Sequence, residues 1–350
     1  MRVVVDAAGR SVAVPRRVSR AVLAEGRILY ALAILETEDP FARLAGWADD
    51  LAKFDPDAFR RYKARFPGLA RLAVFGNAYA SDFSVERAAA IDADLVIFPL
   101  GLQPRLAEGG VLDRLDRAGI PFIFVDFLDD PVRNAAISIR ALGAAFDREA
   151  RAESFVAFHE AELGRVATRI AAIPLERRPL VFVERAAGYA PECCQTFGPF
   201  NYGQFVALAG GRNWGSARFS GFGGKVNPEA VFVDPIDVVI GTGANWSEAV
   251  PDTTAVLLGY DAKPAAVQAR LAALAARPGW RDMQAVRERR FFSIYHQFYN
   301  GPYFVVAIQA MAKWLHPEAF ADLDPVQTFA TLHRRFLPIE FEGVFWSGLP

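Results

Sequence analysis

The sequence predicts an α/β protein built from two Rossmann-like lobes, each with a mainly parallel central sheet, joined by one long α-helix. Three observations lead to this prediction. Short apolar runs rich in β-formers alternate with segments of helical periodicity, a pattern typical of parallel strands joined by crossover helices. A weak internal repeat relates the two halves, and a long segment almost without Gly or Pro separates them.

The first half contains three predicted strands. Residues 18–23 form the first, which precedes the apolar helix 28–35, and residues 95–98 and 122–125 form the other two. Between these last two, VLDRLDRAGI has helical spacing and ends at Gly119, a residue type common at helix C-termini. The second half repeats the pattern, with strands predicted at residues 180–184, 238–240 and 291–294.

Residues 144–173 connect the two halves. They contain no Pro and only one Gly, Gly164, and a helix of this length would span roughly 45 Å. An ordinary long crossover helix is one interpretation, and a rigid connector between domains is the one we favour. The predicted organisation is an N-terminal lobe 1–143, a connecting helix 144–173 and a C-terminal lobe 174–350, whose last helices can pack back toward the first lobe.

The internal repeat relates SVERAAAIDADLVI (84–97) to NPEAVFVDPIDVVI (227–240). Each segment starts with an N-cap residue type followed two positions later by a Glu, near the helix N-terminus where an acid is favoured. Each also places an Asp eight residues after that Glu and an Ile three residues further on. The repeat therefore predicts a short helix running into a buried strand in each lobe.

Composition restricts the class of protein. A chain of 350 residues, 53% hydrophobic and 23% charged, is globular and long enough for two domains. Its 39 basic and 40 acidic residues leave a net charge of −1, so nucleic acid is not expected as a partner. No uninterrupted apolar run approaches the roughly 18 residues of a spanning helix.

The chain resembles substrate-binding proteins of ABC importers for iron siderophores, haem and cobalamin. The resemblance extends over nearly the whole length and depends on the order and spacing of several segments. It implies a class III periplasmic binding protein, located in the periplasm or lipid-anchored, with a leader absent from this numbering. The start, which lacks the layout of a signal peptide, also fits a cytosolic protein. The segments are DAAGRSVAVPRRVSRAV, FSVERAAAIDADLVI, VLDRLDRAGIPFIFVD, VALAGGRNW, VNPEAVFVDPIDVVIGTG, WRDMQAVRERRFFSI and YNGPYFVVAIQAMAKWLHPEAF.

Ligands of open parallel sheets bind beyond the carboxyl ends of the strands, so the loops after the predicted strands are candidates for the binding site. Arginines there can oppose the negative charge of a ferric chelate, as we expect for Arg27, Arg185 and Arg218. Aromatic side chains can stack on a flat ligand. The predicted ligand-binding residues are Arg27, Asn77, Tyr79, Arg185, Tyr189, Cys193, Cys194, Phe222, Asn245, Trp246, His296 and Tyr299.

His296 and Tyr299 follow a predicted strand and could complete the coordination of a ferric ion left open by a tetradentate chelator. No other direct metal ligand is predicted. Glu86 and Glu229, the acids of the repeat, match residues that in the family meet basic residues of the permease. The alternative for each is a helix-dipole residue that stabilises its helix by roughly 0.3–1 kcal/mol.

Cys193 and Cys194 are the only cysteines and lie side by side in a loop-like segment. Adjacent Cα atoms are about 3.8 Å apart, below the usual disulfide range of about 4.4–6.8 Å. A vicinal disulfide that shapes the ligand surface is the preferred interpretation, because disulfides persist outside the cytoplasm. Two free thiols and a soft-metal site are the alternatives.

The predicted function is capture of a ferric siderophore between the lobes and its delivery to an ABC permease in the inner membrane. We expect a monomer with no enzymatic activity and no cofactor. A haem or a corrinoid is the alternative ligand. An α/β nucleotide-dependent oxidoreductase is the alternative of another class, but GTGANW lacks the third glycine of the dinucleotide fingerprint.

Overall fold

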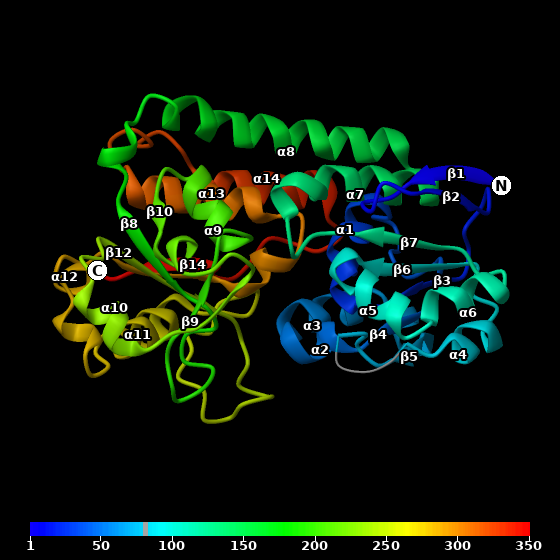
Figure 1. The fold of residues 1–350 in the computed structure, drawn as a ribbon, viewed down its shortest axis with the longest axis horizontal. Helices are drawn as coiled ribbons and strands as arrows, with labels where there is room; N and C mark the ends of the chain where they lie inside the picture. Colours follow the sequence, from blue (N-terminus) through cyan, green and yellow to red (C-terminus); the bar gives the residue numbers. More distant parts are fainter. Residues whose placement is uncertain (80–82) are drawn as a thin grey trace.

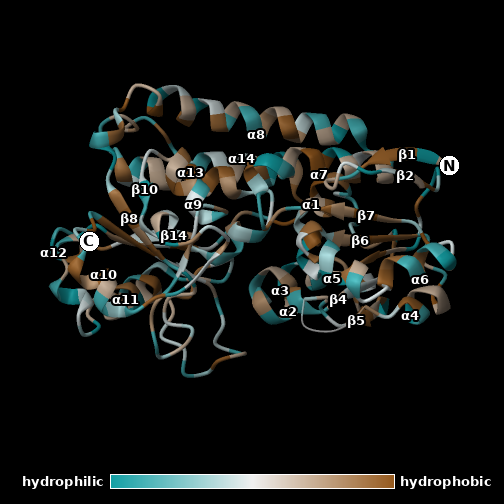
Figure 2. Cartoon of the chain, in the orientation of Figure 1, coloured by the Kyte–Doolittle hydropathy of each residue, from teal (hydrophilic) through white to brown (hydrophobic). Residues whose placement is uncertain are grey.

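The computed structural model describes residues 1–79 and 83–350 and confirms the α/β fold. Two lobes lie side by side, each around its own sheet, and helix α8 (Glu149–Ile170) crosses above both of them (Figure 1). The apolar residues concentrate in the sheets and in the inner faces of the surrounding helices (Figure 2). None of the helices formed by the described residues is both long enough and apolar enough to cross a membrane.

The N-terminal lobe contains a parallel sheet with strand order β5-β4-β3-β6-β7. The chain starts in the middle of this sheet and moves outward first to one edge and then to the other, as in one half of a Rossmann fold. An antiparallel hairpin, β1 and β2, precedes it. The strands are β1 (Arg2–Val5), β2 (Ser11–Val14), β3 (Ala21–Leu23), β4 (Leu44–Ala48), β5 (Ala73–Phe75), β6 (Leu95–Pro99) and β7 (Phe122–Val125). The helices are α1 (Leu29–Leu35), α2 (Asp50–Phe54), α3 (Pro56–Arg65), α4 (Val85–Ala90), α5 (Gln103–Glu108), α6 (Val111–Arg117) and α7 (Pro131–Phe146).

The C-terminal lobe has a mixed sheet in the order β11-β9-β8-β12-β13-β14, with β10 also paired to β8. Its central strands β8, β12 and β13 are parallel, whereas β9, β11 and β14 are antiparallel to their neighbours. The strands are β8 (Leu180–Glu184), β9 (Gln195–Phe197), β10 (Arg212–Asn213), β11 (Gly223–Lys225), β12 (Val238–Gly243), β13 (Phe291–Tyr295) and β14 (Trp346–Gly348). The helices are α9 (Tyr202–Leu208), α10 (Pro228–Val233), α11 (Pro264–Ala275), α12 (Gln284–Arg287), α13 (Phe304–Leu315) and α14 (Pro325–Phe336).

The connecting helix is shorter than the sequence predicts. Residues 144–146 belong to α7, and the chain reverses at Asp147, whose φ of 58° cannot continue a right-handed helix. Helix α8 then has 22 residues, or about 33 Å, instead of roughly 45 Å. The Arg151 side chain donates hydrogen bonds to the Ile34 carbonyl of the first lobe and to the Phe336 carbonyl at the end of α14. The final helix is therefore tied to the connector and to the N-terminal lobe.

The internal repeat corresponds to a helix followed by a central strand in each lobe, α4–β6 and α10–β12. The two aspartates of the repeat, Asp94 and Asp237, make equivalent hydrogen bonds in the two lobes. Asp94 accepts from the Ser19 backbone N–H at 2.7 Å, and Asp237 accepts from the Leu180 N–H at 2.6 Å. Each carboxylate thus holds the beginning of the neighbouring strand, β3 or β8. Pairing of β3 with both of its neighbours starts at Ala21, so the strand begins three residues later than the predicted residue 18.

His159 lies on the buried face of α8, against the rings of Phe155 and Phe304 at centroid distances of 6.0 and 4.7 Å. Its Nε2 has no hydrogen-bond partner among the described residues. Burial lowers the pKa of His159 to about 4, from an ordinary value of 6.5. Between about pH 6.5 and about pH 4, His159 is therefore protonated in the unfolded chain but not in the folded protein. The free energy of unfolding falls as the pH decreases through this range.

The variant His159→Leu is expected to remove about 3 kcal/mol of this acid-dependent loss, because leucine fills the site without a titrating group. Urea unfolding across that pH range, compared with the wild type, measures the difference. A His316→Gln control retains His159 and tests whether loss of any histidine produces the same change. An unchanged slope in His159→Leu would contradict the assignment.

Candidate binding site between the lobes

A cavity of 790 Å³ lies between the lobes. Loops at the carboxyl ends of β3, β4, β5 and β7 form one side, and loops after β8, β12 and β13 form the other. This is where ligands bind in open parallel sheets. The lining residues of the first lobe are Arg27, Asp49, Asp50, Lys53, Phe54, Gly76, Asn77, Tyr79, Leu128 and Asp129. Those of the second lobe are Glu184, Arg185, Ala186, Tyr189, Ala190, Glu192, Cys193, Gln195, Phe222, Trp246, His296, Gln297 and Tyr299.

The cavity brings together most of the residues predicted to bind ligand, although ligand contact itself stays a prediction. In the part of the chain that the structure describes, it is lined by Arg27, Asn77, Tyr79, Arg185, Tyr189, Cys193, Phe222, Trp246, His296 and Tyr299. They come from six loops on two lobes. The rule that ligands bind at the carboxyl ends of strands groups all of them except Phe222, which directly precedes β11.

Three other predicted residues lie outside the lining. Cys194 is fully buried behind Cys193. Asn245 instead donates a hydrogen bond to Asp57 Oδ1 at 2.8 Å, which ties the second lobe to α3 of the first. Arg218 forms an ion pair with Asp234, and its guanidinium lies 3.6 Å from the centre of the Trp214 ring. The Asn245 amide and the Arg218 guanidinium are thus engaged in contacts within the protein.

Sequence reasoning missed several lining residues for an identifiable reason. Asp49, Asp50, Lys53 and Phe54 follow β4, whose sequence LAGWA is interrupted by a glycine and was not predicted as a strand. A Cβ at that glycine would lie 2.5 Å from the Phe75 ring, so the position needs a residue without a side chain. Asp129 follows the correctly predicted strand β7, and the carboxyl-end rule would have found it.

Arg27 is the centre of a buried ionic cluster at the cavity wall. Its guanidinium contacts Glu25 Oε1 at 2.6 Å and Asp50 Oδ2 at 3.0 Å, and it donates to the Tyr299 hydroxyl of the other lobe. Asn300 Nδ2 also donates to Glu25 at 2.6 Å. Burial raises the pKa of Glu25 to about 7, against the opposing effect of Arg27. The charge of Arg27 is therefore compensated within the protein.

His296 and Tyr299 lie side by side, with ring centroids 4.3 Å apart. The Nδ1 of His296 is 2.8 Å from Thr242 Oγ1, and the Trp246 ring packs edge-on at 5.1 Å. Burial, together with Arg185 and Arg27, lowers the pKa of His296 well below its usual value, so the imidazole is neutral. A neutral imidazole with one nitrogen engaged by a hydroxyl has the other nitrogen available for a metal or a ligand.

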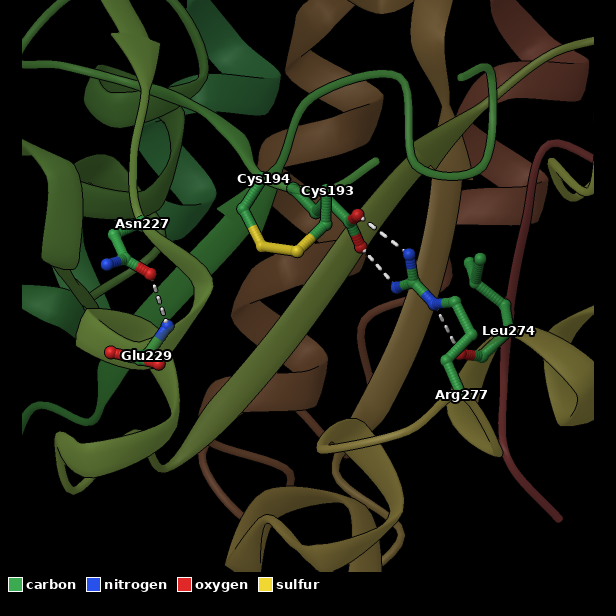
Figure 3. The surroundings of a disulfide bond; sticks show 7 residues. Cys193, Cys194, Asn227, Glu229, Leu274 and Arg277 are labelled. Atoms are coloured by element: carbon green, nitrogen blue, oxygen red, sulfur yellow. Dashed lines mark hydrogen bonds and ion pairs between the residues drawn. A yellow bond between two sulfur atoms is a disulfide. The ribbon is translucent and has the colours of Figure 1, made fainter. Parts of the chain in front are cut away.

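Cys193 and Cys194 are joined in a disulfide, the preferred of the three interpretations (Figure 3). The two alternatives, free thiols and a soft-metal site, both require sulfurs that are not bonded to each other. Behind the disulfide lies Glu184, whose carboxylate is held by both terminal nitrogens of Arg277 at 2.9 and 2.5 Å. The second lobe therefore presents sulfur to the cavity at Cys193, backed by a neutralised carboxylate.

Glu86 and Glu229 are both exposed in the first turn of their helices, α4 and α10. Ser84 caps α4 by accepting from the Arg87 N–H at 3.1 Å, and Asn227 caps α10 by accepting from the Glu229 N–H at 3.0 Å (Figure 3). Both helices lie in their lobes on the side away from α8 (Figure 1). Neither glutamate lines the cavity.

Comparison with known proteins gives this geometry its context. A family profile described as periplasmic binding protein matches residues 39–297. The structure is similar to that of the TroA-like periplasmic binding protein FepB from Veillonella parvula, with a TM-score of 0.90 and 26% sequence identity over 99% of both chains. A search of curated protein sequences finds no match.

More distant structures share the fold. Helicobacter pylori CeuE, determined with Ni(II) bound, has a TM-score of 0.68 at 15% identity over 97% of both chains. A periplasmic heme binding protein from Pseudomonas aeruginosa has a TM-score of 0.57 at 20% identity, over 86% of this chain and 93% of that one. With two α/β lobes, a helical connector, an interlobe cavity and a profile match over most of its length, the chain belongs to the periplasmic binding protein family, whose members are solute-binding components of ABC importers.

Proposed function

We propose that the protein captures a ferric siderophore in the interlobe cavity and delivers it, as a monomer outside the cytoplasmic membrane, to an ABC permease. The family is one of transport proteins and not of enzymes. The observation that carries the choice of ligand is the pair formed by His296 and Tyr299 on the cavity wall.

The chemistry of this pair suits iron held by an incomplete chelator. A tetradentate chelator leaves two positions of an octahedral ferric ion open, and imidazole nitrogen and phenol oxygen are both ligands that iron accepts. The imidazole of His296 is neutral, and Arg27 fixes the orientation of the Tyr299 hydroxyl. The Ni(II) bound by CeuE supports metal binding within this fold.

Haem or a corrinoid is the second candidate, favoured by the aromatic character of the wall. Tyr189 and Trp246 pack edge to face at 5.1 Å, and Phe222 lines the same side. Such rings can stack on a macrocycle, with His296 as an axial ligand. The structural likeness to a heme binding protein supports this alternative.

Tryptophan fluorescence, titrated with ferric hydroxamates, ferric catecholates, haemin, cobalamin and NAD, tests the proposal directly because Trp246 lines the cavity. We expect saturable quenching at submicromolar concentration by a class of ferric chelate. Quenching by haemin or cobalamin alone would instead support the second candidate. Quenching by NAD would point to the oxidoreductase that the sequence left as an alternative.

The variants His296→Ala and Tyr299→Phe are expected to weaken binding of a tetradentate ferric chelate about tenfold or more, because each removes a metal ligand. The same variants should change the affinity for a hexadentate chelate little, since that chelate fills the coordination sphere itself. Tyr299→Phe should also abolish the visible phenolate-to-iron absorption band. Equal losses for both chelates would show that the residues only pack against the ligand.

Glu86 and Glu229 are proposed to dock the two lobes onto basic residues of the permease. Matched acids on the same element of each lobe suit a partner made of two similar halves. Their exposure leaves both carboxylates accessible to a partner.

A further inference from the structure

The charges around the cavity do not suit an anionic ligand. Among the described residues, the basic side chains that line it are Arg27, Lys53 and Arg185, and the acidic ones are Asp49, Asp50, Asp129, Glu184 and Glu192. Acids thus outnumber bases at a wall that the sequence predicted to attract a ferric anion. Which of these charges a ligand experiences depends on how each is paired within the protein.

Internal ion pairs remove the strongest source of positive potential. Arg27 is shared by the buried carboxylates of Glu25 and Asp50, so this cluster carries no net positive charge. Glu184 is neutralised by Arg277, which does not itself line the cavity. When these internally paired residues are set aside, the charged side chains left on the cavity wall are Lys53, Arg185, Asp49, Asp129 and Glu192.

The two remaining cations are shielded in different ways. Lys53 is exposed, with its amino group 5.7 Å from the centre of the Phe54 ring, and solvent screens its charge as it screens the charges of Asp49 and Glu192, which are also exposed. Arg185 lies over the Phe222 ring at 5.1 Å and has no ion-pair partner in residues 1–79 and 83–350. It is the only one of the predicted arginines whose charge remains available to a ligand.

Asp129 is the acid best placed to act on a ligand. It is half-buried, and no ion pair compensates it in the part of the chain that has been described. Burial and the neighbouring Asp126 raise the pKa of Asp129 to about 6, so it is ionised at neutral pH. A Cβ at residue 101 would lie 2.0 Å from Asp129 Oδ2, so Gly101 provides the space this carboxylate occupies.

We propose that the cavity selects metal chelates that carry no net negative charge, with Asp129 as the principal residue that rejects anions and the exposed Asp49 and Glu192 as weaker contributors. The inference rests on the proposed function and specifies its substrate class as neutral or cationic chelates, such as those of hydroxamate type. Ferric tris-catecholates, which are trianionic, are excluded. This proposal differs from the expectation that Arg27, Arg185 and Arg218 together attract an anion.

The test varies charge while the metal site stays constant. A ferric dihydroxamate, whose core is a monocation, is prepared with a linker amine that is free, acetylated or succinylated, so that the whole complex is dicationic, monocationic or neutral. Because the coordination of iron is the same in all three, His296 and Tyr299 contribute equally to each, and a ferric tris-catecholate supplies the anionic comparison. We expect affinity to fall about tenfold at each step as the charge of the complex decreases, and the differences to shrink in high salt.

Variants assign the preference to residues. Asp129→Asn is expected to reduce the advantage of the free-amine over the acetylated chelate by about fivefold. Glu318→Gln removes an exposed carboxylate that does not line the cavity and serves as the matched control. A preference that survives in Asp129→Asn, Asp49→Asn and Glu192→Gln together would overturn the assignment.

The outcomes distinguish the proposed charge selection from the proposed capture of a ferric siderophore. Equal affinities across the series, tightest binding of the succinylated chelate, or binding of ferric catecholates alone would overturn the charge selection and leave chelate capture standing. Binding of haemin or cobalamin alone would overturn the siderophore proposal and the selection with it. Failure of the whole panel to bind would overturn both.

Discussion

Replacing Arg27 by methionine is expected to lower the free energy of unfolding by about 3–5 kcal/mol, because it leaves two buried carboxylates without their cation. Arg27 is 6% exposed, and its partners Glu25 and Asp50 are 2% and 1% exposed. The hydrogen bond from Arg27 to Tyr299 crosses between the lobes and would be lost as well. Denaturant unfolding at neutral pH without ligand measures the loss.

The triple variant Glu25→Gln, Arg27→Met, Asp50→Asn distinguishes a charge effect from lost packing. Glutamine can still accept from Asn300, and asparagine can still accept from the Gly26 N–H, so both hydrogen bonds remain possible. We expect the triple variant to recover most of the stability that Arg27→Met loses. Arg140→Met, which breaks a pair with Glu153 that is about half exposed, should cost less than about 1 kcal/mol. A similar loss in Arg27→Met and Arg140→Met would contradict the cluster's role.

Buried strands were the part of the fold that the sequence predicted best. β6, β7, β8 and β13 lie within one residue of their predicted bounds, because each is a continuous apolar run covered on both faces by helices. β4 was missed, as were most strands of four residues or fewer, namely β1, β2, β5, β9, β10, β11 and β14. Tertiary pairing rather than local pattern makes these segments strands.

The positions of the site residues were predictable, but their electrostatic state was not. Every loop of the site except that of Phe222 follows a strand, and parallel strands bring their carboxyl ends to one edge, which is a local rule. The compensation of Arg27 by Asp50 depends on two loops that are adjacent only through the pairing of β3 with β4. Asn245 likewise finds Asp57 across the lobe interface, a contact that sequence spacing does not encode.

Reversing both docking charges, in the variant Glu86→Arg, Glu229→Arg, is expected to reduce uptake at least tenfold while ligand affinity stays at the wild-type level. Like charges placed opposite each other at an interface cost several kcal/mol, and two lobes would be repelled at once. Neither glutamate lines the cavity, so binding by tryptophan quenching is the internal control. Uptake in cells whose own copy is deleted measures delivery.

The neutral variant Glu86→Gln, Glu229→Gln separates docking from a role in helix stability. If the acids only favour their helix N-termini, this variant loses roughly 0.3–1 kcal/mol of stability per site and transports normally. If they meet basic residues of a permease, transport falls and each single variant falls less than the double. Reversal of two exposed acids elsewhere, Asp113→Arg and Glu318→Arg, changes net charge by the same amount and should leave uptake intact. Normal uptake by the double reversal would show that these two acids have no part in docking, because repulsion from both lobes would then have had no effect.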